Sequence, residues 1–496
     1  MKRKTITLFF LFCAFNLYSQ TTYIPDDSFE QALIDLGYDS GQLDDQISTA
    51  NIINLTTLDL HGKNITNLTG IEDFAKIREL DISDNQILVV DLSENTALES
   101  LNASRNGLVE LDLTVNTELM MLDCSNNQLN ELEVNRQGLL EDLNCSFNSI
   151  RELHLEGNPV LKELRVSNNL IADLDLSANL ELEVLHVAKN ALTDLRIMEQ
   201  ERLTDLVASD NILTSIDITQ NPGLGRIDLD GNHIYIIDLT NNQQVTRLHL
   251  SGNELQELDI SENTLIEYLG APGNHLDYVD LSNNDMLQII EVQGNQISGL
   301  EISNNLDLSY IDFSDNLITE VDLIKNVTLE TLIASNTLLE ALDIRSNIML
   351  NTMSAVGIPT LSCITVLDVD DAMANSSWVK DESMIYSTDC GALAPISNIF
   401  EELEVLSLLT EPNVTRLDKG ISFYPNPISD VIHIDSDKPI THVIIYSTLG
   451  RKVLDIQSDF STISTAILPE GLYIIKIESE EGYIIKKMMK TIVPKS

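Results

Sequence analysis

The sequence has 496 residues, of which 78 are Asp or Glu and only 29 are Lys or Arg, so its formal charge is −49. Such an acidic excess argues against nucleic acid and anionic membranes as partners. The excess lies between residues 21 and 420, because residues 421–496 hold eight basic and nine acidic side chains.

The first 19 residues have the pattern of a secretory signal peptide. Basic residues at positions 2–4 precede an apolar run at positions 6–17, and Ser19 is small enough for the cleavage site. Cys13 follows an aromatic residue, which argues against a lipoprotein anchor. No other segment reaches the roughly 18 apolar residues of a membrane span. We therefore expect an exported protein without a transmembrane helix.

Residues 20–55 are predicted to form an N-terminal cap. The sequence Pro25-Asp26-Asp27-Ser28 begins a helix with acidic residues in its first turn, and Gly37 ends it. The apolar side chains of this helix would cover the end of a hydrophobic core that otherwise faces water.

A 21-residue pattern then repeats from residue 56 to residue 352. One unit, residues 248–268, reads LHLSGNELQELDISENTLIEY, in which apolar residues two apart share one face of a short strand. Two such segments in each turn predict two short strands joined by bends at asparagine. No insertion or deletion interrupts the step, so the pattern predicts a mainly β solenoid of about thirteen stacked turns.

Two columns of amide side chains run through these turns. The first begins at Asn64, and the second runs from Asn95 to Asn347 with Gln137 and Gln200 as its exceptions. An inward amide offers donors and an acceptor to backbone groups of the bends. Amides stacked at about 4.8 Å can also bond along the column. The predicted structural ladder contains Asn85, Asn106, Asn127, Asn148, Asn169, Asn190, Asn211, Asn232, Asn253, Asn274, Asn295 and Asn316.

The repeats resemble leucine-rich repeats. Residues 77–85, IRELDISDN, follow the LxxLxLxxN signature, which recurs in strict register over residues 56–352. A second L-D-x-S-x-N half-turn, in place of a helix, is similar to secreted leucine-rich proteins of Bacteroidetes-type bacteria. Residues 70–74, GIEDF, resemble the segment that follows the cap helix in such proteins.

The second half-turns place acidic residues outward on consecutive turns. Neighbouring carboxylates at strand spacing repel by roughly 0.9 kcal/mol in a water-like dielectric, which salt and side-chain splaying absorb. One interpretation is a solvated face that keeps strands from pairing with other chains. The alternative is binding of calcium or another divalent cation. The candidate metal ligands are Asp217, Asp238, Asp259, Asp280 and Asp322, and Glu301 and Asp343 continue the column.

The first half-turns carry a second candidate surface. Arg and Tyr commonly anchor interfaces, and here they interrupt an acidic and Ser-rich surface. Gly270 and Pro272 break the strand pattern and are expected to open space beside Tyr268. The alternative is ordinary drift between repeats on a solvated sheet. The candidate partner-binding residues are Arg226, Arg247, His249, Tyr268 and Tyr310.

No catalytic constellation is present in the sequence. There is no GxSxG, HExxH or phosphate-loop motif. His186 and His249 share an outward column, but three turns separate them by about 14 Å, which is too far for one metal ion. We therefore expect no enzymatic activity and no cofactor, apart from the calcium alternative above.

Residues 353–391 are predicted to cap the C-terminal end of the solenoid. Cys363 and Cys390 bracket a non-repeating segment around the only tryptophan, Trp378. In an exported protein this arrangement favours a disulfide bond, and two free buried thiols are the alternative. Cys124 and Cys145 lie one turn apart in an inward column, where stacking as small core residues is favoured over a disulfide.

Residues 392–420 have the composition of a linker, and residues 421–496 that of a small β-sandwich-like domain. The latter segment contains YPNP at 424–427, LGRKV at 449–453, a GLYIIK strand and a basic tail. In order and motifs it resembles the C-terminal sorting domain of type IX secretion substrates. That resemblance implies the secretion machinery as a partner, and release or surface attachment after the outer membrane is crossed.

These features together predict a secreted or surface-displayed monomer that binds an extracellular protein or glycan without catalysis. The alternative is a structural surface protein that divalent cations organise through its acidic face.

Overall fold

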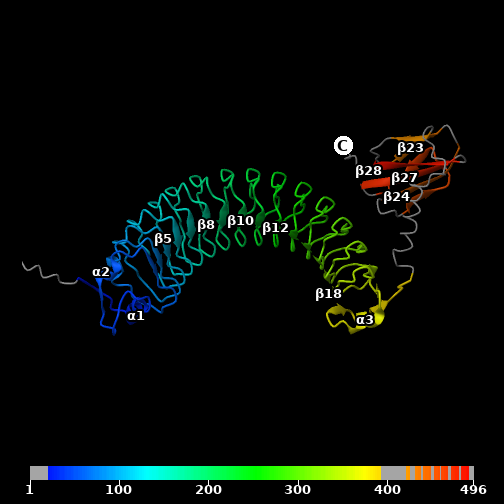
Figure 1. The fold of residues 1–496 in the computed structure, drawn as a ribbon. Helices are drawn as coiled ribbons and strands as arrows, with labels where there is room; N and C mark the ends of the chain where they lie inside the picture. The colour runs from blue at the N-terminus through cyan, green and yellow to red at the C-terminus, as the bar shows by residue number, and fades with distance from the viewer. Residues whose placement is uncertain are drawn as a thin grey trace, which may run out of the picture. The chain divides into compact units, whose positions relative to one another are not determined.

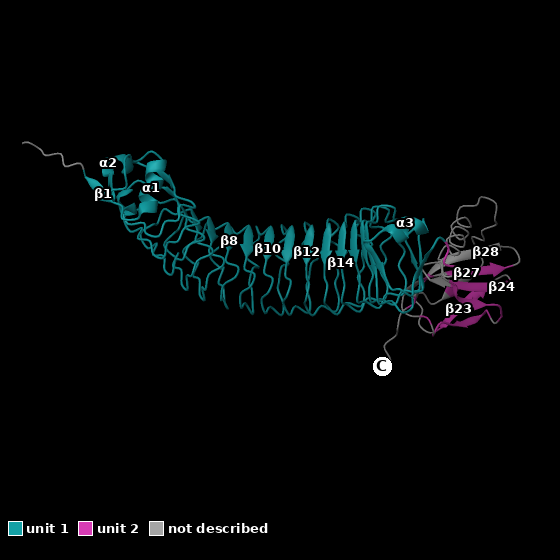
Figure 2. Cartoon of the chain, turned by 90° about the horizontal axis from the view of Figure 1, so that it is seen from below, with its two compact units in different colours: residues 1–388 teal, residues 389–496 magenta. Residues whose placement is uncertain are grey.

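The computed structural model describes residues 20–391 and, between residues 421 and 490, the strands and a few adjoining residues. The predicted signal peptide and the predicted linker at 392–420 lie outside the described residues. The chain divides into two compact units, residues 1–388 and 389–496, which Figure 2 distinguishes by colour. Within the described residues, no helix is long and apolar enough to cross a membrane.

The first unit is built on a parallel sheet of sixteen short strands, which follows the inner side of an arc (Figure 1). The middle side chain of a typical strand is buried, while its two neighbours are at least partly exposed on the concave face. The strands are β3 (Thr57–Asp59), β4 (Glu79–Asp81), β5 (Ser100–Asn102), β6 (Met121–Asp123), β7 (Asp142–Asn144), β8 (Glu163–Arg165), β9 (Val184–His186), β10 (Asp205–Val207), β11 (Arg226–Asp228), β12 (Arg247–His249), β13 (Tyr268–Gly270), β14 (Ile289–Glu291), β15 (Tyr310–Asp312), β16 (Thr331–Ile333), β18 (Thr352–Ala355) and β20 (Trp378–Lys380).

The 21-residue step holds from β4 to β18, as where Leu248 of β12 lies opposite Leu269 of β13. The first turn differs, because β3 and β4 pair with a step of 22 residues, Leu58 opposite Leu80. Lys63 therefore takes the ladder position of that turn, and its backbone N–H donates to Asn85 Oδ1 at 3.1 Å. The expectation of an uninterrupted step that begins at Asn64 is wrong at this turn.

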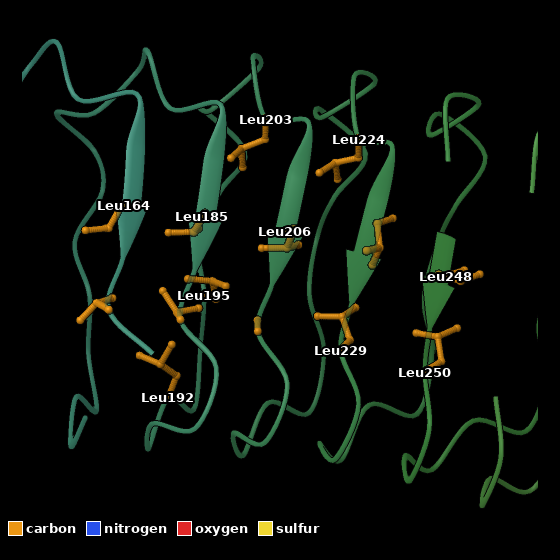
Figure 3. Close-up of a cluster of buried hydrophobic side chains, with 14 of the residues drawn as sticks. Leu164, Leu185, Leu192, Leu195, Leu203, Leu206, Leu224, Leu229, Leu248 and Leu250 are labelled. Carbon is orange, nitrogen blue, oxygen red and sulfur yellow. The ribbon is translucent and has the colours of Figure 1, made fainter. Parts of the chain in front are cut away.

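The core is a stack of aliphatic columns that runs from cap to cap. Figure 3 shows leucines of successive turns in equivalent positions, such as Leu164, Leu185 and Leu206 at the strand centres. One buried cluster extends from Phe29 in the N-terminal cap to Met384 near the C-terminal end. Each fully buried leucine stabilises the fold by roughly 1.5–3 kcal/mol, and each neighbouring turn covers part of its surface.

The second half-turns do not pair into a continuous ladder. Strands there are confined to the C-terminal end, where β17 (Leu342–Asp343), β19 (Cys363–Thr365) and β21 (Ile385–Ser387) form a three-stranded sheet. The prediction of two strands in every turn is therefore wrong for most turns. On the outer side of an arc the turns lie farther apart than on the inner side, so strand spacing is kept only on the concave face.

The N-terminal cap contains α1 (Asp27–Asp35), α2 (Thr49–Ile52), a hairpin of β1 (Thr21–Tyr23) with β2 (Gln46–Ser48), and, within the first turn, the 3₁₀ helix η1 (Ile71–Asp73). Asp26 caps α1, and its Oδ1 accepts from the backbone N–H groups of Ser28 and Phe29 at 2.9 and 3.0 Å. Its Oδ2 accepts from Thr66 N, Thr66 Oγ1 and Asn67 N of the first turn. One carboxylate thus joins the cap helix to the solenoid.

At the C-terminal end, α3 (Val369–Ala374) lies between β19 and β20 in the sequence, and β20 extends the main sheet. Trp378 of β20 packs edge-on against Tyr386 with ring centroids 6.2 Å apart. Cys363 and Cys390 are disulfide-bonded, as the sequence predicts.

The second unit contains two antiparallel sheets. One is β22 (Ile421–Tyr424), β23 (Val431–Ser436) and β26 (Thr462–Ser464); the other is β25 (Lys452–Ile456), β24 (Ile440–Ser447), β27 (Gly471–Ser479) and β28 (Gly482–Lys490). A single buried cluster draws residues from both sheets, including Ile432 of β23 and Ile475 of β27. This is the small β-sandwich-like arrangement that the sequence predicts.

Candidate functional site

The ladder asparagines bind the backbone of two successive turns. In Asn253, Nδ2 donates to the carbonyl of Leu229 in the preceding turn at 2.9 Å and to that of Leu250 at 3.2 Å. Its Oδ1 accepts from the backbone N–H of Ile234 at 3.0 Å. In the described part of the chain, no hydrogen bond joins two ladder amides to each other. The column therefore holds turns together through side chain to backbone bonds.

The second amide column works in a similar way on the other side of the core. Asn263 Nδ2 donates to the carbonyls of Leu239 and Asn242 in the preceding turn, at 3.0 and 2.9 Å. These side chains are fully or almost fully buried. Most of them leave Oδ1 without a protein partner among the described residues, so each contributes chiefly as a donor.

The outward acidic column closes the bends of the second half-turns. Asp259 Oδ1 accepts from the backbone N–H of Ser261 at 3.0 Å, and the same Asx turn recurs at Asp217, Asp238, Asp280 and Asp322. The carboxylates of Asp217, Asp238 and Asp259 each accept hydrogen bonds from the Ser or Thr two residues later in the chain. These bonds lower the pKa of all three carboxyl groups below the usual value. Within the described residues, no three His, Cys, Asp or Glu side chains are grouped as metal ligands.

The two candidate arginines of the concave face differ in their surroundings. Arg226 on β11 lies 3.3 Å from Asp228 and 3.9 Å from Asp205. Arg247, on the neighbouring strand β12, is exposed and forms no ion pair among the described residues. Its guanidinium group is therefore available to an external partner.

Tyr268 is fixed in place across the concave face. Its ring stacks on His249 of the preceding turn, with centroids 4.4 Å apart, and its hydroxyl donates to Glu291 Oε2 of the following turn at 2.5 Å. Burial, together with this hydrogen bond, raises the pKa of Tyr268 well above its usual value.

The ring of Tyr268 also covers Gly270 on the same strand. A Cβ atom at position 270 would lie 2.8 Å from the Tyr268 hydroxyl oxygen and 2.9 Å from Cε1. The space that the sequence predicts beside Tyr268 is therefore occupied by the ring itself, and any larger residue at 270 would displace it.

The remaining candidate, Tyr310, lies on β15, two strands from Tyr268. Strand β14, with Ile289 and Glu291, separates the two tyrosines. Burial raises the pKa of Tyr310. The structure thus brings together Arg247, His249, Tyr268 and Glu291, which we call the aromatic patch.

A second feature of the concave face, on β6 to β9, was not predicted from the sequence. It is a shallow depression of about 270 Å³. Its lining consists of Ser125, Asn126, Asn144, Ser146, Phe147, Arg165, Ser167 and His186. Phe147 stands where the neighbouring turns have Asn126 and Asn168, and that exchange of amide for aromatic is the signal that could have located it.

Two further cysteines lie in the core, directly after strands β6 and β7. Cys124 and Cys145 are buried free thiols, and burial raises the pKa of Cys145 to about 12. Both therefore remain protonated and act as small apolar residues.

Comparison with known proteins gives a family for the C-terminal residues and similar folds among solved structures. Residues 422–491 match the family described as "Secretion system C-terminal sorting domain". The functional domain of InlJ from Listeria monocytogenes, which includes a cysteine ladder, is similar in structure, with a TM-score of 0.60 and 24% identity, over 95% of this chain and 99% of that one.

Two other solved structures share the solenoid fold. The internalin InlF from Listeria monocytogenes has a TM-score of 0.59 and 18% identity, over 63% of this chain and 97% of its own. The leucine-rich-repeat protein LIC12759 from Leptospira interrogans has a TM-score of 0.54 and 20% identity, over 67% of this chain and 97% of its own. At these identities the likeness establishes the fold alone. Comparison with curated protein sequences gives no match.

Proposed function

We propose that this leucine-rich-repeat protein, which a type IX sorting domain directs to the cell surface or the medium, is a non-catalytic module that binds an extracellular protein or glycan. The binding surface is the concave face of the solenoid, centred on the aromatic patch.

The unpaired Arg247 beside the His249–Tyr268 stack is the observation that carries this proposal. Of the three arginines on the described strands of the concave sheet, Arg165 and Arg226 lie beside carboxylates and Arg247 does not. A rigid tyrosine and an arginine together are the residue types that contribute most at binding interfaces. Because Tyr268 is already held by its neighbours, it loses little conformational entropy when a partner binds.

The experiment uses two double variants of the exported protein. Arg247→Glu with Tyr268→Ala should abolish capture of the protein or glycan that an extracellular array identifies. The matched control is Asp259→Asn with Asp280→Asn on the outer face, where asparagine preserves the Asx turns while removing two charges. This control should bind like the wild type.

Thermal melting accompanies both variants, so that a folding defect is recognised. Equal losses of binding in the two variants would point to a diffuse electrostatic effect and would contradict a site on the concave face. A calcium titration followed by melting tests the acidic-face alternative, which requires a rise in melting temperature that the Asp259→Asn, Asp280→Asn variant lacks.

A further inference from the structure

We infer that the depression on β6 to β9 is a second binding site, which takes one ring of a neutral oligosaccharide. This inference deepens the proposed binding function and rests on it. The residues that carry it are Phe147 and the serine and asparagine side chains that line the depression with it.

Phe147 has an unfavourable backbone conformation and remains largely in solvent. Its φ is 57°, in the left-handed region that bulky residues avoid, and its exposed fraction is 53%. Asn126 and Asn168, at the same position of the adjacent turns, have φ values of 56° and 57°, and asparagine tolerates this region well. The left-handed conformation recurs at this bend in most turns, so what sets Phe147 apart is a bulky aromatic side chain, for which the conformation costs on the order of 1–3 kcal/mol.

Two of the serine hydroxyl groups that line the depression each accept one hydrogen bond. Ser125 Oγ accepts from Asn126 Nδ2 at 3.3 Å, and Ser167 Oγ accepts from the backbone N–H of Ala188 at 3.1 Å. A hydroxyl that accepts one bond still has its own proton and a second lone pair. Both serines are therefore suited to the alternating donors and acceptors of sugar hydroxyl groups.

The charges around the depression favour a neutral ligand. Arg165 lies 3.2 Å from Asp142 and 2.5 Å from Glu163, so two carboxylates offset its charge. His186 lies 3.2 Å from Asp205. A sulfate or carboxylate group would find no unpaired cation on these side chains and would meet like charges nearby. A neutral sugar avoids this repulsion, and its apolar ring face packs on a phenyl ring.

The size of the depression restricts the ligand further. Pockets that enclose drug-sized ligands occupy roughly 300–1,000 Å³, whereas this one has about 270 Å³. It therefore accommodates a single ring, and a longer chain would continue across the concave face.

The test is binding of the exported protein to an array that contains neutral, sialylated and sulfated oligosaccharides. The variant is Phe147→Asn, because asparagine is the native residue at this position in the flanking turns and relieves the backbone strain. Binding to neutral oligosaccharides should weaken about tenfold or more, the loss expected when an aromatic anchor is removed. The melting temperature should not fall.

Lys189→Asn is the matched control, since Lys189 has the same left-handed conformation, with a φ of 54°, but does not line the depression. It should bind neutral oligosaccharides like the wild type. The inference would be overturned if the wild-type protein bound no neutral oligosaccharide, or bound only charged ones. It would also be overturned if Phe147→Asn bound neutral oligosaccharides as well as the wild type does. In that case, a protein or glycan whose binding is abolished by Arg247→Glu with Tyr268→Ala would still support the proposed function.

Discussion

A ladder asparagine satisfies backbone groups on two turns at once, which no apolar residue of the same size could do. Asn253 binds carbonyls of both its own turn and the preceding one, and accepts from the N–H of Ile234. These groups are buried, so water does not replace the amide when it is removed.

Asn253→Ala should therefore lower the free energy of unfolding by about 1–3 kcal/mol, the cost of leaving buried backbone groups unpaired. Urea unfolding followed by circular dichroism measures the change. Asn241→Ala is the control, because Asn241 also donates to a backbone carbonyl, that of Thr219 at 3.1 Å, but at an exposed position. Equal losses in the two variants would show that burial of the ladder is not what matters.

Asp26 predicts a pH dependence of the N-terminal cap. Burial raises the pKa of this carboxyl, but the hydrogen bonds from Thr66, Phe29 and Asn67 outweigh burial and hold the pKa below its usual value. The unfolded chain therefore binds the proton more readily. The stability that Asp26 contributes is complete above the unfolded pKa of about 3.9 and is lost as the pH falls through the lower pKa of the folded state.

Melting of the N-terminal cap between pH 2 and pH 6 should accordingly depend less on pH in Asp26→Asn than in the wild type, and Asp26→Asn should be less stable at pH 7. Hydrogen exchange of the α1 amides reports on the cap alone. Asp27→Asn, at an exposed position of the same helix, is the control and should retain the wild-type pH dependence.

At this scale the sequence predicts positions but not rotamers. The spacing of Asn85 to Asn316 is enough to place twelve inward amides, because a repeat in strict register repeats its geometry. The ring of Tyr268 was not predictable in the same way. Its direction depends on Gly270, His249 and Glu291 together, and those lie on three different turns. Phe147 was missed because its turn otherwise follows the pattern.

At the scale of elements, one turn is the unit of stacking. From β4 to β18 each turn pairs with the next at the same register, so the turns on either side of residues 248–268 have matching surfaces. The sequence predicts this stacking but not the loss of strand pairing on the outer side. That loss follows from curvature, which is a property of many turns and not of one.

Deletion of residues 248–268 should yield a folded solenoid that is one turn shorter, because Arg247 then continues into Leu269 in the same register. Deletion of residues 248–258 should not, since it brings unlike half-turns into contact. Circular dichroism and melting distinguish the two chains. Identical melting would mean that the 21-residue register does not specify the fold.

For the whole molecule, the two buried clusters are separate. The solenoid cluster contains no residue beyond Met384, and that of the second unit begins at Ile432, among the described residues. Each unit therefore has a hydrophobic core of its own. The match of residues 422–491 to a sorting domain agrees with this division.

A chain that ends at Leu417 should fold normally but remain in the periplasm, while the full chain reaches the surface or the medium and loses its last segment. Cell fractionation and mass spectrometry of the C-terminus measure both outcomes. Normal amounts of the truncated chain at the surface would contradict the role of the sorting domain.

The unbroken 21-residue step between β4 and β18 also has a genetic consequence. Any two of these turns are interchangeable at their boundaries, so unequal recombination between their codons would add or remove whole turns without disturbing either cap. Each event would move the aromatic patch and the Phe147 depression relative to the ends by multiples of about 4.8 Å. The length of the solenoid can thus change by whole turns while the stacking of the remaining turns is preserved.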